Sequence, residues 1–114
     1  MGKNILIVDD SSMMRKMIAK TLREAGHTVA GEARSGAEAV ARYRELRPDM
    51  VTMDITMRDM DGFAAAREIL EADPAARIIF LSNLDEEKYS RDAEELGAVG
   101  YVNKHKSKDI LALI

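Results

Sequence analysis

The 114-residue chain has no cysteine, no long apolar run and no excess of positive charge. The absence of cysteine excludes disulfide bonds, thiol catalysis and cysteine-based zinc sites. No apolar run approaches the ~20 residues that a membrane-spanning helix needs, so membrane association is not expected. Because the net charge is −3, the chain has no overall attraction for nucleic acids, and direct nucleic-acid binding is not expected either.

The length and composition are those of one small domain. Hydrophobic residues make up 46% of the chain and charged residues 32%, which is ordinary for a soluble protein. A chain of this size can bury one core layer on each side of a sheet and little more. The first four residues lead directly into an apolar run, which leaves no room for a signal peptide. A cytoplasmic location is therefore the default expectation.

Strand-like and helix-like segments alternate along the chain. The apolar run 5–8 is rich in β-branched residues, as expected for a strand that is buried on both faces. Further strands are expected at 28–32, 50–53, 77–81 and 99–102. Helices are expected at 12–25, 35–46, 62–72, 85–96 and from 107 onward.

Local signals predict where these helices begin and end. Ser35 and Glu38 have the spacing of a capping box. Gly26 and Gly97 each follow a helical pattern, at a position where glycine commonly ends a helix. The N-caps expected for the last two helices are Asp85 and Ser107.

Five alternating strand–helix units predict an α/β fold with one parallel sheet covered on both faces. Ligands of such sheets bind outside the carboxyl ends of the strands, where the strand order reverses. In the flavodoxin-like order 2-1-3-4-5 that point lies between the first and third strands. The carboxyl ends of these two strands are therefore the expected site.

Four charged residues lie at strand ends. Asp9 and Asp10 close the first strand, Asp54 closes the third and Lys104 closes the fifth. In a parallel sheet these ends meet at one edge, where three carboxylates and one ammonium group leave a formal charge of −2. Such a cluster is relieved by a bound cation, and oxygen-only ligands favour Mg²⁺ or Ca²⁺.

Four motifs in register resemble the receiver domains of two-component response regulators, in particular the single-domain chemotaxis (CheY-like) type. The matching stretches are 6–11, 54–62, 80–82 and 100–104. The resemblance covers nearly the whole chain and implies one receiver domain over residues 1–114. The rule that ligands bind where the strand order reverses was derived partly from proteins of this type. It is therefore not independent support for the resemblance.

The resemblance implies a function, a cofactor and roles for the site residues. It implies a signalling switch rather than an enzyme, apart from catalysis of its own phosphorylation and dephosphorylation. Asp54 would accept the phosphoryl group and Lys104 would pair with it. Ser82 and Tyr101 would form the conformational switch. The ligands implied for Mg²⁺ are Asp10, Asp54 and the Thr56 carbonyl, with Asp9 acting largely through water.

The resemblance also implies partners. The phosphoryl donor would be a phosphohistidine of a histidine kinase or phosphotransfer protein, docked on the helix expected at 12–25. That helix carries cations beside two methionines: Arg15, Lys16, Lys20 and Arg23 beside Met13 and Met17. The output would be a separate protein, or an effector domain further along a longer chain. It would read the fourth helix, fifth strand and fifth helix.

Three positions depart from the family pattern. Arg58 and His105 stand where proline is usual, and Asn83 stands where a small residue follows the switch hydroxyl. A cis bond before a residue other than proline costs ~2.5–4 kcal/mol, so we expect the Lys104–His105 bond to be trans. The three departures leave the acid and lysine set intact.

The main alternative is a receiver-fold interaction module that no longer uses phosphate, which these three departures would favour. A phosphatase of the haloacid dehalogenase type needs an acid two residues after the nucleophile, where this chain has Thr56. A flavin carrier of the flavodoxin type is disfavoured because Asp9 and Asp10 would repel its phosphate.

Overall fold

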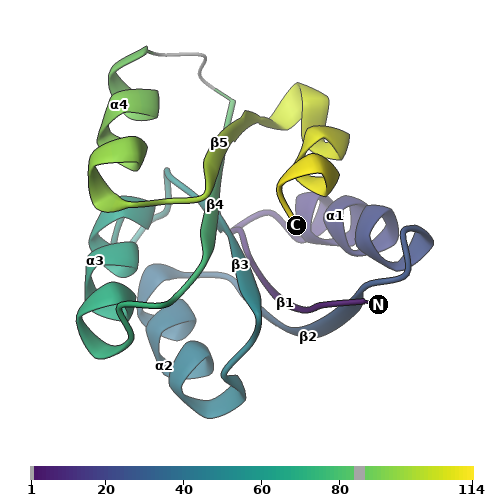
Figure 1. Cartoon of the computed structure of the whole chain (residues 1–114), viewed down its shortest axis with the longest axis horizontal. Helices are drawn as coiled ribbons and strands as arrows, with labels where there is room; N and C mark the ends of the chain where they lie inside the picture. Colours follow the sequence, from purple (N-terminus) through teal and green to yellow (C-terminus); the bar gives the residue numbers. More distant parts are fainter. Residues whose placement is uncertain (1, 84–86) are drawn as a thin grey trace.

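The computed structural model describes residues 2–83 and 87–114. Five parallel strands form one sheet in the order β2-β1-β3-β4-β5, with helical segments on both of its faces (Figure 1). The strands are β1 (Asn4–Val8), β2 (Thr28–Ala33), β3 (Met50–Asp54), β4 (Ile78–Ser82) and β5 (Gly100–Asn103). The helices are α1 (Ser12–Glu24), α2 (Gly36–Leu46), α3 (Gly62–Ala72), α4 (Glu87–Leu96) and the 3₁₀ segment η1 (Lys104–Leu113). The doubly wound, flavodoxin-like fold predicted from the sequence is confirmed.

The two faces of the sheet have separate cores. Alternate strand residues face α1 and η1, where Ile18 and Leu22 of α1 and Ile110 of η1 are buried. The other strand residues face α2, α3 and α4, where the ring of Phe63 packs at a tilt against that of Phe80 of β4, with ring centroids 4.8 Å apart. Figure 1 shows the same division, with α1 and the yellow η1 on one side and α2, α3 and α4 on the other.

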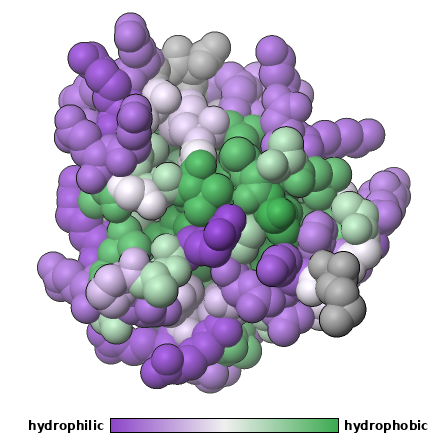
Figure 2. All heavy atoms as spheres, viewed as in Figure 1, coloured by the Kyte–Doolittle hydropathy of each residue, from purple (hydrophilic) through white to green (hydrophobic). Residues whose placement is uncertain are grey.

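Apolar residues also reach the surface in places. Figure 2 shows them gathered near the centre of one face of the molecule, surrounded by polar side chains.

Within residues 2–83 and 87–114, no helix is both long enough and apolar enough to cross a membrane.

The predicted helix ends agree closely with the observed ones. Gly26 and Gly97 follow α1 and α4 with φ angles of 88° and 84°, which an L side chain would resist. Ser35 caps α2, its Oγ accepting from the Glu38 N–H at 3.1 Å. Arg47, left-handed at φ 43°, ends that helix just before Pro48. The predicted cap Asp85 lies outside the described residues.

The last helical segment has an additional turn before the expected helix. η1 is a 3₁₀ segment whose N-cap is Asn103, and Lys106 divides it with non-helical angles (φ −122°, ψ 43°). The part after this kink begins at Ser107, where the last helix was expected. The short turn before the kink was not predicted; it starts at Asn103, a good capping residue at the end of β5.

Candidate functional site

The topology brings the three predicted aspartates together. β1 and β3 are neighbours in the sheet, so Asp9 and Asp10 after β1 lie beside Asp54 at the end of β3. One carboxylate oxygen of each aspartate lies within 4.8 Å of those of the other two. Asp9 and Asp54 are buried, at 1% and 4% exposure, whereas Asp10 is exposed to solvent. The predicted acidic cluster is therefore present, with one member open to the outside.

Lys104 reaches this cluster from the end of β5, the edge strand that lies next to β4. It follows β5, so its side chain passes the end of β4 to reach β3 and β1. Its Nζ lies 2.8 Å from Asp9 Oδ2 and 3.1 Å from Asp54 Oδ1, and its side chain is only 10% exposed. The ammonium group thus neutralises part of the charge of the two buried carboxylates.

Burial and crowding of like charges perturb the ionisation of the site. Burial, and then the charge of Asp9, raise the pKa of Asp54 to about 6, although Lys104 acts in the opposite direction. Burial alone would lower the pKa of Lys104, but its contacts with Asp9 and Asp54 outweigh burial and raise that pKa. Lys104 therefore stays protonated, and the cluster keeps an excess of negative charge that a cation would relieve.

Asp9 is fixed in place by four contacts. Its N–H donates to the Ala33 carbonyl at 3.0 Å, and its Oδ1 accepts from the Ser11 N–H at 2.9 Å. Its Oδ2 pairs with Lys104, and its carbonyl oxygen accepts from Arg15 Nη1 at 2.7 Å. Arg15 was expected on the docking face of α1. Its side chain is instead only 16% exposed and pairs with Glu32 of β2 at 2.9 Å.

The loop between β3 and α3 is tied to two neighbouring elements. Gly62 donates its N–H to the Ile55 carbonyl at 2.7 Å. Asp59 accepts from the N–H groups of Gly36 and Ala37 at the start of α2, at 3.0 Å each. These two bonds, Ala37 first, lower the pKa of Asp59. No local pattern points to a role for Asp59, because its partners lie 22 and 23 residues away.

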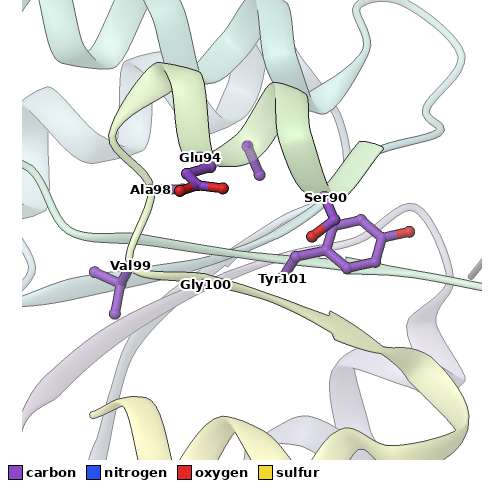
Figure 3. Close-up of a pocket in the computed structure, with 7 residues that line it drawn as sticks. Ser90, Glu94, Ala98, Val99, Gly100 and Tyr101 are labelled. Atoms are coloured by element: carbon purple, nitrogen blue, oxygen red, sulfur yellow. The ribbon is translucent and has the colours of Figure 1, made fainter. Parts of the chain in front are cut away.

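A cavity of about 360 Å³ opens over the acidic cluster. It is lined by Asp10, Ser11, Asp54, Thr56, Ser82, Asn83 and Lys104. Asp9 does not line this cavity, but its carboxylate pairs with Lys104, which does. Tyr101 does not line it either. It lines a second hollow, of about 230 Å³, where its ring extends along β5 below Ser90 and Glu94 of α4 (Figure 3).

The donor atoms suit Mg²⁺. They are carboxylate oxygens from three residues, held close enough together to share one small cation, and hard oxygen ligands are what Mg²⁺ prefers. The residues present therefore fit a divalent cation of this class.

Comparisons with known proteins agree with this geometry. The model of the response regulator receiver domain matches residues 5–114. The chain is 47% identical to the chemotaxis protein CheY of Thermotoga maritima, over 91% of the chain and 87% of that protein. It is 46% identical to CheY of Bacillus subtilis, over the same shares of each. The chain belongs to the response regulator receiver domain family.

Solved structures of receiver domains superimpose closely on this one. A chain of the CheX–CheY–BeF₃–Mg²⁺ complex from Borrelia burgdorferi matches with a TM-score of 0.91 and 34% identity, over 96% of this chain and 84% of that one. A LuxR-family response regulator from Aurantimonas matches with a TM-score of 0.92 and 33% identity, over 98% and 81%. The chain is a CheY-like receiver domain, a phosphoacceptor switch of two-component signalling rather than a classical enzyme.

The predicted acid and lysine groups of this receiver domain lie together despite the three departures from the family pattern. The peptide bond between Lys104 and His105 is trans, as expected, and Lys104 still reaches both buried aspartates. Arg58 is exposed and borders a separate hollow beside Asp10. Asn83 is the departure that lines the cavity itself. None of the three departures separates the acid and lysine groups.

Proposed function

We propose that Asp54 is the phosphoacceptor of this domain. It borders the cavity, its carboxylate is 3.1 Å from a protonated lysine, and it is joined by two further aspartates able to hold a cation. In the transfer, an Asp54 oxygen attacks the donor phosphorus, a P–O bond to Asp54 forms, and the bond from phosphorus to the leaving group breaks. The close Lys104–Asp54 contact is the observation that carries the proposal.

The neighbouring residues divide the remaining tasks. Asp10, Asp54 and the Thr56 carbonyl would hold Mg²⁺, with Asp9 acting largely through water. The cation would neutralise charge on the phosphoryl oxygens and position them. Lys104 offers a second positive contact to those oxygens. The Ser82 hydroxyl lines the same cavity, where it can donate to a phosphoryl oxygen. Tyr101, which lines the hollow beside α4, would change position in response to phosphorylation.

The same site would catalyse both the gain and the loss of its phosphoryl group. A histidine kinase or phosphotransfer protein in the cytoplasm would be the physiological donor, docking beside the site on α1. There Lys16, Met13 and Met17 are exposed, Met13 at 73%. The output partner would bind α4, β5 and η1 and would be sensitive to salt, because the described part of α4 carries four acids against two bases. Direct binding to nucleic acid or membrane is not proposed.

The assignment is tested by incubating the protein with acetyl phosphate and Mg²⁺ and measuring its mass. We expect a gain of one phosphoryl group that does not occur when Mg²⁺ is chelated before the incubation and that is absent from Asp54→Asn. The matched control is Asp109→Asn, which alters an exposed aspartate on η1 and should be phosphorylated normally. A wild-type chain that gains no mass would support the phosphate-independent interaction module instead. A phosphorylated Asp54→Asn variant would place the acceptor elsewhere.

A further inference from the structure

Lys104 is carried by a backbone turn that closes around it. Its chain neighbours are joined by a hydrogen bond, in which the His105 N–H donates to Asn103 Oδ1 at 2.8 Å. Asn103 is the last residue of β5 and is paired in register with Ser82 of β4. The turn is therefore anchored to the sheet immediately before the lysine and closed immediately after it.

This anchoring matters because Lys104 must reach two fixed targets with a flexible side chain. Its Nζ contacts Asp9 Oδ2 and Asp54 Oδ1 from the opposite side of β4. A lysine side chain has four rotatable bonds beyond its Cα, so the direction in which the backbone presents it decides how often it reaches the pocket. Lys106, two residues after Lys104, has non-helical backbone angles. No continuous helix therefore follows the turn and keeps it in place.

We propose that Asn103 is a positioning residue for phosphoryl transfer, which acts through Lys104. Its side-chain oxygen fixes the turn that directs the lysine to Asp54. His105 contributes only its backbone N–H, because its own side chain is exposed. The inference rests on the proposed roles of Asp54 and Lys104, and it adds Asn103, which has no role in that proposed function.

The competing explanation is that Asn103 merely caps η1. A cap stabilises a helix by satisfying a free N–H group, and its loss lowers the melting temperature. It would not slow a reaction measured far below that temperature. Rate and stability therefore separate the two explanations.

The experiment measures the rate of phosphorylation by acetyl phosphate at saturating Mg²⁺, with a thermal melt of each variant. We expect Asn103→Ala to be slower by about tenfold, the size of effect that a small displacement of a reacting group can produce. Asn103→Ser keeps a capping oxygen and should recover most of the rate. His105→Ala keeps the N–H donor and should react like the wild type. The matched control is Asn4→Ala, at the opposite end of the sheet.

A double-mutant cycle with Lys104 completes the test. In a Lys104→Met background, Asn103→Ala should cause no further loss, because the group that it positions is already absent. Losses that multiply in the double variant would overturn the proposal, as would a wild-type rate in Asn103→Ala. If the wild-type protein itself is not phosphorylated, the proposed function fails first, and the two failures are thereby distinguished.

Discussion

Arg15 connects helix α1 to the acidic turn, because its Nη1 donates to the carbonyl oxygen of Asp9 at 2.7 Å. The same guanidinium is held from β2 by Glu32, whose carboxylate accepts from Nε at 2.9 Å. A residue expected on the docking surface is thus part of the framework of the site. Among the cations expected on the docking face, Lys16, Lys20 and Arg23 remain exposed.

Replacing Arg15 should weaken the site. Arg15→Ala leaves the Asp9 carbonyl without its charged donor, and we expect a loss of about 1.5–3 kcal/mol in the free energy of unfolding. Mg²⁺ affinity should fall as well, because the turn that carries Asp9 and Asp10 is released. Calorimetric titration with Mg²⁺ and urea unfolding measure the two effects. Arg23→Ala, on the exposed side of the same helix, is the control; Mg²⁺ affinity that is equal in both variants would contradict this role.

Asp54 should make the stability of the metal-free protein depend on pH. Its pKa rises from an ordinary 3.8 to about 6 in the folded state. The folded state binds the proton of the Asp54 carboxyl group more tightly than the unfolded state does. The contribution of this protonation to stability is therefore fully present below pH 3.8. It is lost as the pH rises through about 6. A shift of this size corresponds to roughly 3 kcal/mol.

The measurement is the difference in unfolding free energy between wild type and Asp54→Asn across this pH range, in the presence of a chelator. Subtracting the two removes the titration of the other carboxylates. The asparagine variant should become the more stable protein as the pH rises towards 7, and Mg²⁺ should restore the wild type. A difference that stays constant with pH would show that Asp54 is not perturbed.

Gly62 should be intolerant of any side chain. A Cβ at this position would lie 2.2 Å from the Asp54 carbonyl oxygen and 2.9 Å from the Ile55 Cα, so the backbone that carries the acceptor would have to move. We expect Gly62→Ala to lose about 1–3 kcal/mol of stability and to be phosphorylated slowly. Gly26→Ala is a useful comparison: it strains a left-handed residue in open space, far from the site. It should lose stability without slowing phosphorylation, and equal rates in both variants would refute the argument.

The sequence predicted those parts of the site that depend on topology. Alternating strands and helices bring strand ends to one edge, so Asp9, Asp54 and Lys104 could be placed together without knowing any distance. Contacts between elements far apart in the chain left no such signal. Asp59 reaches residues 22 and 23 positions away, and Arg15 reaches Glu32, 17 positions away. Nothing in the local pattern identifies such partners.

The short turn before the last helix was missed for a related reason. Asn103 and Ser107 are both good N-cap residues, and only the helix that begins at Ser107 was expected. Asn103 starts a further turn because β5 ends there, in register with Ser82, and the chain must turn at once to deliver Lys104. That constraint comes from the assembled sheet rather than from the neighbouring sequence.

Asp59 should hold the acceptor loop against α2. Its two bonds to the Gly36 and Ala37 N–H groups place a negative charge at the positive end of that helix. Its lowered pKa means that this stabilisation is present above the ordinary carboxyl pKa and is lost as the pH falls through the lowered value. Asp59→Ala should therefore lower the melting temperature at neutral pH and speed hydrogen exchange at the Gly36 and Ala37 amides.

The same variant should also phosphorylate more slowly, because the loop from Ile55 to Asp61 carries Thr56 at the edge of the cavity. Ser35→Ala provides the matched control, since it removes a local cap of the same helix and leaves the Asp59 contact in place. It should lower the melting temperature while keeping the normal rate. If both variants were equally slow, the rate would depend on α2 itself rather than on the loop that Asp59 anchors to it.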